Sequence, residues 1–363
     1  MQAVESPGGA PLSAARKVRV CSFSAWAGAL TPVEDYLAQL PAMDLRPLVA
    51  DRSDAELMRK ARLDCDWYGE NARCLAAMSH PELTFLPAWI VGKAGVLDLA
   101  KAPREPGEER WFITMAQQPQ AFGELASKVF RLLARSGVRQ LYYAFDEASR
   151  RMTCFPEIAP HLDVLIHDEA PLSDEGRARL RPGAVSVHRS WVANVLPYAA
   201  PFNEAPEPKI LFLGSQMGLT PHRRRQIDFL QRTFKDRFVA STDHSVGVGE
   251  RLSLNRYQVG LCPEGRMFAT PAMSRSHTDR PFWSGCLGLV PVSEDSAQGG
   301  RLDGLASSGL ILRYAHGDLK ALAEACEQAL AMPVAARRRI YEHFNRHETV
   351  GTVVAAAIAA AAA

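Results

Sequence analysis

The sequence lacks the short motifs that mark several common kinds of site. It has no Cys-x-x-Cys pair, no His-Glu-x-x-His and no cysteine or histidine cluster with zinc-ligand spacing. The acidic pair Asp64 and Asp66 precedes no apolar run that resembles a metal-binding strand. No Gly-x-Gly-x-x-Gly follows the first apolar run, which argues against a nicotinamide-dependent enzyme. We therefore expect an activity that needs neither a metal ion nor a cofactor.

Net charge is also small. The formal charge is +2 over 363 residues, so the overall field gives no sign of a nucleic-acid partner. The seven cysteines are scattered, several of them inside apolar runs, which suits reduced thiols better than disulfides. Hydrophobic residues make up 47% and charged residues 23%, as in ordinary soluble proteins. These features predict a cytoplasmic protein, and its length suits two domains.

Neither end of the sequence has the long apolar run of a membrane span. Residues 1–16 lack the apolar core of a signal peptide and are rich in Pro, Gly, Ser and Ala, which predicts a disordered leader. The tail VVAAAIAAAAA is apolar but too short to cross a bilayer, and its alanines favour a helix. We expect residues 347–363 to form a terminal helix that packs on the body. A peripheral contact with a membrane surface is the alternative.

Short apolar runs alternate with amphipathic stretches, which is typical of parallel α/β sheets. The expected strands are 17–23, 45–50, 82–88, 111–116, 140–145 and 162–167, then 209–215, 237–242, 257–263, 287–292 and 309–314. Helices are expected at 120–138, 221–234, 317–331 and 334–346.

A proline-rich stretch divides this pattern in two. Residues 192–209 hold four prolines and little periodicity, as linkers do. We therefore predict an α/β fold of two Rossmann-like domains, residues 17–200 and 201–346. Ligands of open parallel sheets bind beyond the carboxyl ends of the strands, so two such domains facing each other would enclose a cleft with the site in it.

One candidate phosphate site follows the first strand of the second half. Gly214 and Ser215 form a turn, and Thr220 and Pro221 then open a helix as N-cap and first helical residue. Free backbone N–H groups at a helix start attract phosphate, and Arg223 adds positive charge. Alternatively, Arg223 and the two arginines after it are simply a solvated helix face.

A second candidate segment follows the strand that ends at Pro263. Its loop carries Glu264 and Gly265 and leads into TDRPFWSGCLGLVPV, residues 278–292. A carboxylate such as Asp279 can accept hydrogen bonds from ribose hydroxyls, and a guanidinium such as Arg280 matches phosphate oxygens. The alternative is an exposed acid and arginine that cap a helix.

The segments LCPEG and TDRPFWSGCLGLVPV resemble the carboxyl-terminal halves of GT-B glycosyltransferases, especially the exostosin-like and CgeB-like families. The resemblance implies two Rossmann-like domains and a nucleotide-sugar donor. Thr278, Asp279 and Arg280 are also similar to the Thr-Glu-Lys segment of fucosyltransferase-like enzymes, which implies that the acid binds the ribose hydroxyls and the cation binds the diphosphate. The further candidates for donor binding, from the two segments described above, are Gly214, Ser215, Arg223, Glu264 and Gly265. Many members of these families carry a glutamate where this sequence has Trp283. A protein that binds the donor without turnover is therefore an alternative hypothesis.

The first half offers candidates for a general base, which an inverting transfer needs to deprotonate the acceptor hydroxyl. Asp146 follows the strand at 140–145, and Asp168 and Glu169 follow the strand at 162–167. Acids at such positions also serve as helix N-caps. Trp26 lies in the turn after the first strand, where it would stack on an acceptor sugar or, alternatively, pack in the core.

The leading hypothesis is metal-independent transfer of a sugar from a nucleotide-sugar to a hydroxyl acceptor, with the base supplied by the amino-terminal domain. The acceptor, a glycan, a lipid or a protein, is left open. The alternatives are another nucleotide-sugar enzyme, such as an epimerase, and an inactive binding or scaffold protein of the same fold.

Overall fold

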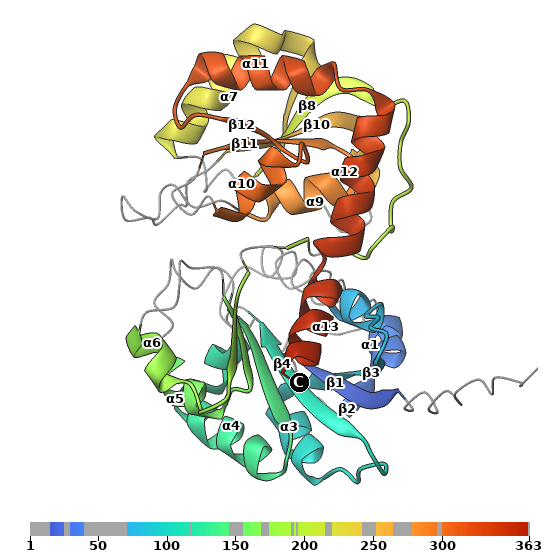
Figure 1. Cartoon of the computed structure of the whole chain (residues 1–363), viewed down its shortest axis with the longest axis vertical. Coiled ribbons are helices and arrows are strands. Elements are labelled where there is room, and N and C mark those ends of the chain that lie inside the picture. The colour runs from blue at the N-terminus through green and yellow to red at the C-terminus, as the bar shows by residue number, and fades with distance from the viewer. Residues whose placement is uncertain are drawn as a thin grey trace, which may run out of the picture.

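The chain is seen here as a computed structural model that describes residues 15–24, 30–39, 71–115, 118–144, 155–167, 174–189, 192–193, 195–214, 220–241, 252–263, 278–295 and 300–361. These residues form two α/β lobes, each built on one sheet, with one lobe above the other in Figure 1. The predicted α/β class with two Rossmann-like units is confirmed. The strand predicted at 45–50 and nearly all of the predicted leader lie outside the described residues.

The first lobe contains a seven-stranded sheet of order β2-β3-β1-β4-β5-β6-β7. Its strands are β1 (Arg16–Ser24), β2 (Leu30–Pro32), β3 (Leu83–Val91), β4 (Glu109–Met115), β5 (Arg139–Ala144), β6 (Val164–His167) and β7 (Val185–His188). All neighbouring strands are parallel except β2, which runs antiparallel to β3. The sequence pattern missed β7 because this edge strand has only four residues, alternately half-buried and exposed.

Helices cover both faces of this sheet. They are α1 (Val33–Gln39), a helix at 71–76, α3 (Gly92–Lys101), η3 (Gln118–Leu125), α4 (Ala126–Arg135), α5 (Phe155–Ile158), η4 (Ala159–His161) and α6 (Asp174–Arg179). The single helix predicted at 120–138 is divided, because Gly123 has a non-helical backbone with φ 54° and ψ −136°. Gly137, with φ +71°, lies just beyond the end of α4 as expected.

The second lobe contains a five-stranded parallel sheet of order β12-β11-β10-β8-β9. Its strands are β8 (Glu207–Leu213), β9 (Phe238–Ser241), β10 (Tyr257–Cys262), β11 (Val290–Glu294) and β12 (Leu312–Tyr314). Its helices are α7 (Pro221–Phe234), η5 (Lys235–Arg237), η6 (Ser253–Arg256), α9 (Arg280–Cys286), α10 (Gly300–Ser307), α11 (Leu319–Leu330) and α12 (Val334–His347). The strand predicted at 287–292 begins only at Val290, because Gly288, with φ +83°, turns the chain after α9.

The last helix returns the chain to the first lobe. α12 packs on α9 in the second lobe, and α13 (Val350–Ala360) continues from it onto the first sheet (Figure 1). Val354 and Ile358 of α13 are fully buried in the same core as Trp111 and Val164. Gly351 is required at this contact, since a Cβ there would lie 2.2 Å from the carbonyl oxygen of Cys74. None of the described helices is both long enough and apolar enough to cross a membrane.

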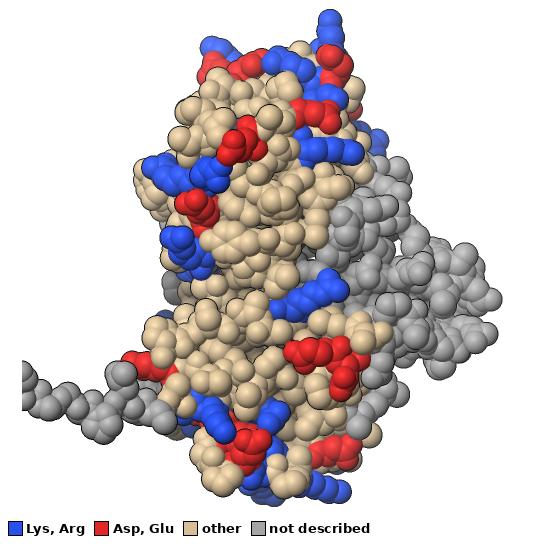
Figure 2. Space-filling view, turned by 90° about the vertical axis from the view of Figure 1, so that its right-hand side faces the viewer, with Lys and Arg blue, Asp and Glu red and all other residues tan. Residues whose placement is uncertain are grey.

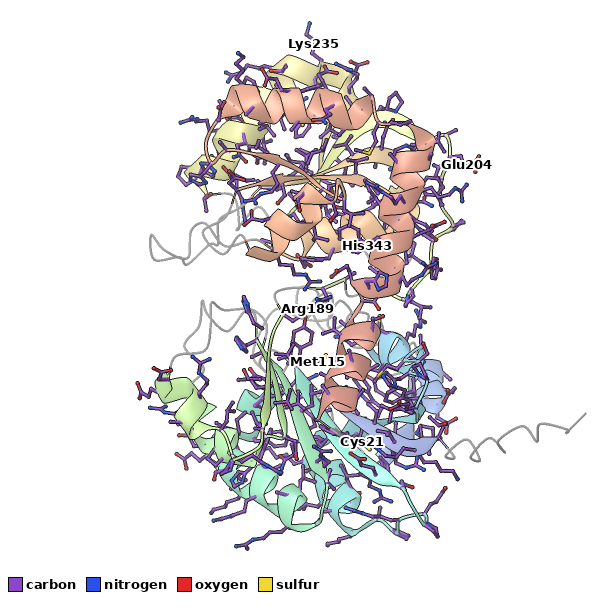
Figure 3. All side chains as sticks on the ribbon, in the orientation of Figure 1. Cys21, Met115, Arg189, Glu204, Lys235 and His343 are labelled. Atoms are coloured by element: carbon purple, nitrogen blue, oxygen red, sulfur yellow. The ribbon has the colours of Figure 1, made fainter. Side chains whose placement is uncertain are left out.

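The carboxyl ends of the first sheet face the second lobe. Figure 3 shows Met115, at the end of β4, and Arg189, just after β7, on that side of the first lobe, with His343 of α12 across from them. Helices α9 and α10 lie on the side of the second lobe that faces the first (Figure 1). On the face shown in Figure 2, charged side chains of both signs are interspersed over both lobes.

Candidate functional site

Arg280 links the start of α9 to the carboxyl end of β8 in the second sheet. It is the first residue of α9, which follows β10 along the chain. Its Nε donates a hydrogen bond of 2.9 Å to the carbonyl oxygen of Leu213, the last residue of β8. Its Nη1 donates to Thr278 Oγ1 at 3.2 Å. These bonds hold the guanidinium at the edge of the sheet where ligands of parallel sheets bind.

Gly214 makes room for this guanidinium. A Cβ at Gly214 would lie 3.1 Å from Arg280 Nη2 and 2.6 Å from Phe212 Cζ. The guanidinium carbon also lies 5.6 Å from the centre of the Phe212 ring. The structure therefore brings together Gly214, Thr278 and Arg280, three of the residues that the sequence proposed for donor binding.

Among the described residues, no carboxylate balances the charge of Arg280. Within the described ranges, no carboxylate forms an ion pair with Arg280, whose side chain is half-buried. Its hydrogen bonds in the described part of the chain go to neutral oxygens. A partly desolvated guanidinium without a counter-charge is suited to bind an anion such as phosphate.

The start of α7 forms as the sequence predicts. Thr220 Oγ1 accepts a hydrogen bond of 3.2 Å from the backbone N–H of Arg223, and Pro221 is the first helical residue. The Arg223 side chain is buried, with 5% exposed, and so it does not lie on a solvated face. Arg224 and Arg225 are both exposed, and Arg225 donates to the carbonyl oxygen of Gly317 at 3.2 Å. The three consecutive arginines therefore do not form a single solvated face.

Asp279 and Trp283 differ in what they can offer a ligand. The Asp279 carbonyl oxygen accepts from the N–H groups of Phe282 and Trp283, and its side chain makes no capping bond. Its half-buried carboxylate is thus not used to cap α9. Trp283 is 7% exposed and packs in an apolar cluster with Leu211 and Leu289. Because an indole has no acceptor atom, Trp283 cannot accept a hydrogen bond from a ribose hydroxyl.

Several of the proposed residues lie outside the part of the chain that the structure describes. They are Trp26, Asp146, Asp168, Glu169, Ser215, Glu264 and Gly265, together with the pair Asp64 and Asp66. Their roles stay predictions. His167, the residue before Asp168, is described: it is buried, its Nε2 lies 3.1 Å from Ser186 Oγ, and its ring stacks on that of His188.

The sequence did not reveal a cluster of charges between the lobes. Glu348, between α12 and α13, is buried and pairs with Arg301 of α10. Its Oε2 lies 3.4 Å from Arg189 Nη2, just after β7. Burial, and next the nearby charge of Arg189, lower the pKa of Arg301 to about 9. These residues are far apart in the chain, so no local pattern could have placed them together.

The sequence also gave no sign of a second cluster, formed by His222, Glu294 and His316. One possible ligand atom from each of these side chains lies within 4.8 Å of the other two. Imidazole and carboxylate groups so arranged could hold a metal ion.

No protein-family model matches the chain, and no curated protein matches it. Its structure is similar to that of the N-terminal domain of trehalose-6-phosphate phosphatase from Candida albicans, with 10% identity, a TM-score of 0.44 and 99% of each chain covered. It is similar to O-GlcNAc transferase from Thermobaculum terrenum, with 14% identity, a TM-score of 0.45, and 97% of this chain and 69% of that one covered.

A third similar structure is trehalose 6-phosphate synthase from Burkholderia multivorans, with 13% identity, a TM-score of 0.41, and 96% of this chain and 98% of that one covered.

Proposed function

We propose that the chain is a nucleotide-sugar-dependent glycosyltransferase of GT-B type that holds the donor diphosphate at Arg280. The observation that carries this proposal is the geometry at the carboxyl end of β8. There the guanidinium of Arg280 is fixed by Leu213 and Thr278 and passes close to Gly214 without a carboxylate partner among the described residues. The resemblance of the segment 278–292 to GT-B families supports the same role.

Among the described residues at this edge of the sheet, Arg280 would supply most of the positive charge for the diphosphate. In the first turn of α7, Pro221 has no N–H and the N–H of Arg223 is bonded to Thr220 Oγ1. Only the N–H of His222 remains among these first three helical residues. The helix dipole still favours an anion at this end. A guanidinium that binds the leaving nucleoside diphosphate stabilises the charge that develops on it in the transition state, without a metal ion.

The first lobe would bind the acceptor. In the sequence, Asp146 follows β5, and Asp168 and Glu169 follow β6. Arg189, which follows β7 at the carboxyl edge of the first sheet, contacts Glu348 between the lobes. One of the three acids would take the proton of the acceptor hydroxyl as its oxygen attacks the anomeric carbon and the nucleoside diphosphate leaves. A position between the lobes would bring the two substrates together and exclude water.

A second candidate function is nucleotide-sugar binding without turnover. The observation that favours it is the burial of Trp283 in the core, at the position where many GT-B relatives present a glutamate to the ribose. Binding of the donor through Arg280 is common to both candidates, and only release of the nucleotide separates them.

The test is titration of the full chain with UDP-, GDP- and CMP-sugars, followed by thermal shift and by assay of released nucleotide. Arg280→Ala is compared with Arg232→Ala, which removes an exposed arginine from the last turn of α7. We expect one donor class to stabilise the wild type and the control but not Arg280→Ala. Release of nucleotide identifies a transferase, and binding without release identifies the second candidate. Equal binding by Arg280→Ala would contradict the proposed site.

A further inference from the structure

The His222–Glu294–His316 cluster joins three separate elements of the second lobe. His222 lies in the first turn of α7, Glu294 is the last residue of β11, and His316 follows the end of β12. The Glu294 side chain is fully buried, whereas the side chains of His222 and His316 are 28% and 35% exposed. The two imidazole rings stack, with centres 4.5 Å apart and planes 18° apart. The cluster is therefore anchored at its carboxylate and open to solvent at its histidines.

Hydrogen-bond donors are crowded around one oxygen of this cluster. Four nitrogen atoms approach Glu294 Oε1: His222 Nε2 at 2.7 Å, His316 Nδ1 at 3.1 Å, Gln226 Nε2 at 2.9 Å and the Gly317 N–H at 2.9 Å. A carboxylate oxygen has two lone pairs. Three of these contacts are hydrogen bonds and the fourth, from His316 Nδ1, is within ion-pair distance, so more nitrogen atoms face this oxygen than its two lone pairs can accept from.

The contact between His222 and Gln226 is a second conflict. Gln226 Nε2 lies 3.1 Å from His222 Nε2, which in turn faces Glu294 Oε1 at 2.7 Å. If His222 Nε2 carries a proton for the carboxylate, it has no lone pair for the amide N–H. If His222 Nε2 carries no proton, its lone pair faces a lone pair of Glu294 Oε1. Exchanging the side-chain oxygen and nitrogen of Gln226 does not resolve the conflict, because the amide oxygen would then lie 2.9 Å from Glu294 Oε1. A cation between the imidazole and the carboxylate removes the conflict.

We propose that His222, Glu294 and His316 bind one zinc ion, with ligand atoms His222 Nε2, a carboxylate oxygen of Glu294 and His316 Nδ1. Zinc favours imidazole nitrogen and carboxylate oxygen at about 2.0–2.2 Å in a tetrahedral arrangement, so that ligand atoms lie roughly 3.3 Å apart. The present separations of 2.7 and 3.1 Å from Glu294 Oε1 need only small shifts to reach this spacing.

The surroundings of the three ligands support the same assignment. With zinc bound, Gln226 and Gly317 keep their hydrogen bonds to Glu294 as an outer shell, which orients the carboxylate. Gln226 is itself held by a hydrogen bond of 3.2 Å from the Tyr314 hydroxyl. Three protein ligands leave a fourth position on the solvent side for water or another ligand oxygen. The zinc ligands are side-chain atoms, whereas the proposed diphosphate site uses the guanidinium of Arg280 and the backbone N–H of His222, so the zinc site does not depend on the proposed function.

The test is direct zinc binding by the untagged full chain after removal of metal with a chelator. Isothermal titration with zinc chloride gives stoichiometry and affinity, and titration with cobalt gives the visible absorption of a four-coordinate site. We expect one zinc ion per chain. His222→Gln and His316→Gln should each weaken binding by roughly 100-fold or more, since loss of an outer-shell partner alone costs 10–100-fold. His347→Gln, which changes an exposed histidine of α12, should bind as the wild type does.

Absence of stoichiometric zinc binding by the wild type would overturn the proposal, and this result needs no variant to fold. Wild-type affinity in both histidine variants would also overturn it, because the ion would then be bound elsewhere. Circular dichroism of the metal-free variants establishes that any loss of binding is not a loss of fold. Loss of the cobalt absorption band in folded His316→Gln supports the assignment.

Discussion

Gly214→Ala tests the packing on which the position of Arg280 depends. The added Cβ would lie 2.6 Å from Phe212 Cζ and 3.1 Å from Arg280 Nη2. Phe212 is only 1% exposed, so its ring has little room to move away. The backbone at residue 214, the ring or the guanidinium therefore has to shift. We expect this substitution to lower both the stability of the second lobe and its affinity for a nucleoside diphosphate.

The two effects have different sizes. Overpacking of a dense core costs typically about 1–3 kcal/mol, and each kcal/mol lowers the melting temperature of a domain of this size by roughly 2–4 °C. A lost hydrogen bond to a charged group costs about 1.5–3 kcal/mol, and every 1.4 kcal/mol is tenfold in affinity. A displaced Arg280 should therefore weaken binding by roughly 10- to 100-fold.

The measurements are urea denaturation and calorimetric titration with the nucleoside diphosphate of the donor that binds. Gly304→Ala is the matched control, because a Cβ at this exposed position of α10 meets nothing within 4 Å. It should raise stability by about 0.5–1 kcal/mol and leave binding unchanged. Unchanged stability and affinity in Gly214→Ala would refute the packing argument. Lower stability with unchanged affinity would show that Arg280 does not hold the diphosphate.

Three further substitutions test other parts of the fold. Burial opposes the charge of Glu108, but hydrogen bonds from Arg110 and Arg19 hold the pKa of its carboxyl below 4.5. The stability from these bonds is present above the pKa of the unfolded carboxyl and is lost as pH falls through the folded pKa. Glu108→Gln should thus cost about 1.5–3 kcal/mol in urea denaturation at neutral pH, and a difference from wild type that did not shrink below about pH 4 would contradict this. Gly351→Ala should cost about 1–3 kcal/mol and expose α13 to proteolysis, because its Cβ meets a backbone carbonyl oxygen; unchanged protection would count against this contact. Thr220→Ala should cost about 0.5–2 kcal/mol through loss of the helix cap, and Thr220→Ser should restore most of it in the same denaturation assay.

Local signals in the sequence predicted many of the elements well. The helix expected at 221–234 matches α7 (Pro221–Phe234), because its cap residue, its first-turn proline and its apolar period all lie within the segment itself. Strand predictions were wrong where the apolar pattern was short or where a turn interrupted it. The edge strand β7 was missed, and β11 begins three residues later than expected because of the turn at Gly288.

The candidate site was predicted in part. Gly214, Thr278 and Arg280 were identified from strand ends and from a resemblance, and the structure places them together. The role of Arg223 in donor binding stays a prediction, but its side chain is buried and so does not lie on a solvated helix face. The pattern of charges alone could not show this, because consecutive helix residues point in different directions and only the packing of α7 decides which of them is covered.

The α/β alternation, the start of α7 and the polar groups at strand ends could be predicted from the sequence alone, because each depends on residues close together in the chain. Which of those groups meet depends on how the elements pack in three dimensions. β8 lies beside β10, so Arg280 reaches Leu213, and β11 lies beside β12, so Glu294 meets His316. α13 returns to the first lobe, so Glu348 meets Arg189 and Arg301. Hydrophobic periodicity determines which face of each strand is buried, but it does not determine which strands pair. The contacts above depend on the order of the strands in each sheet.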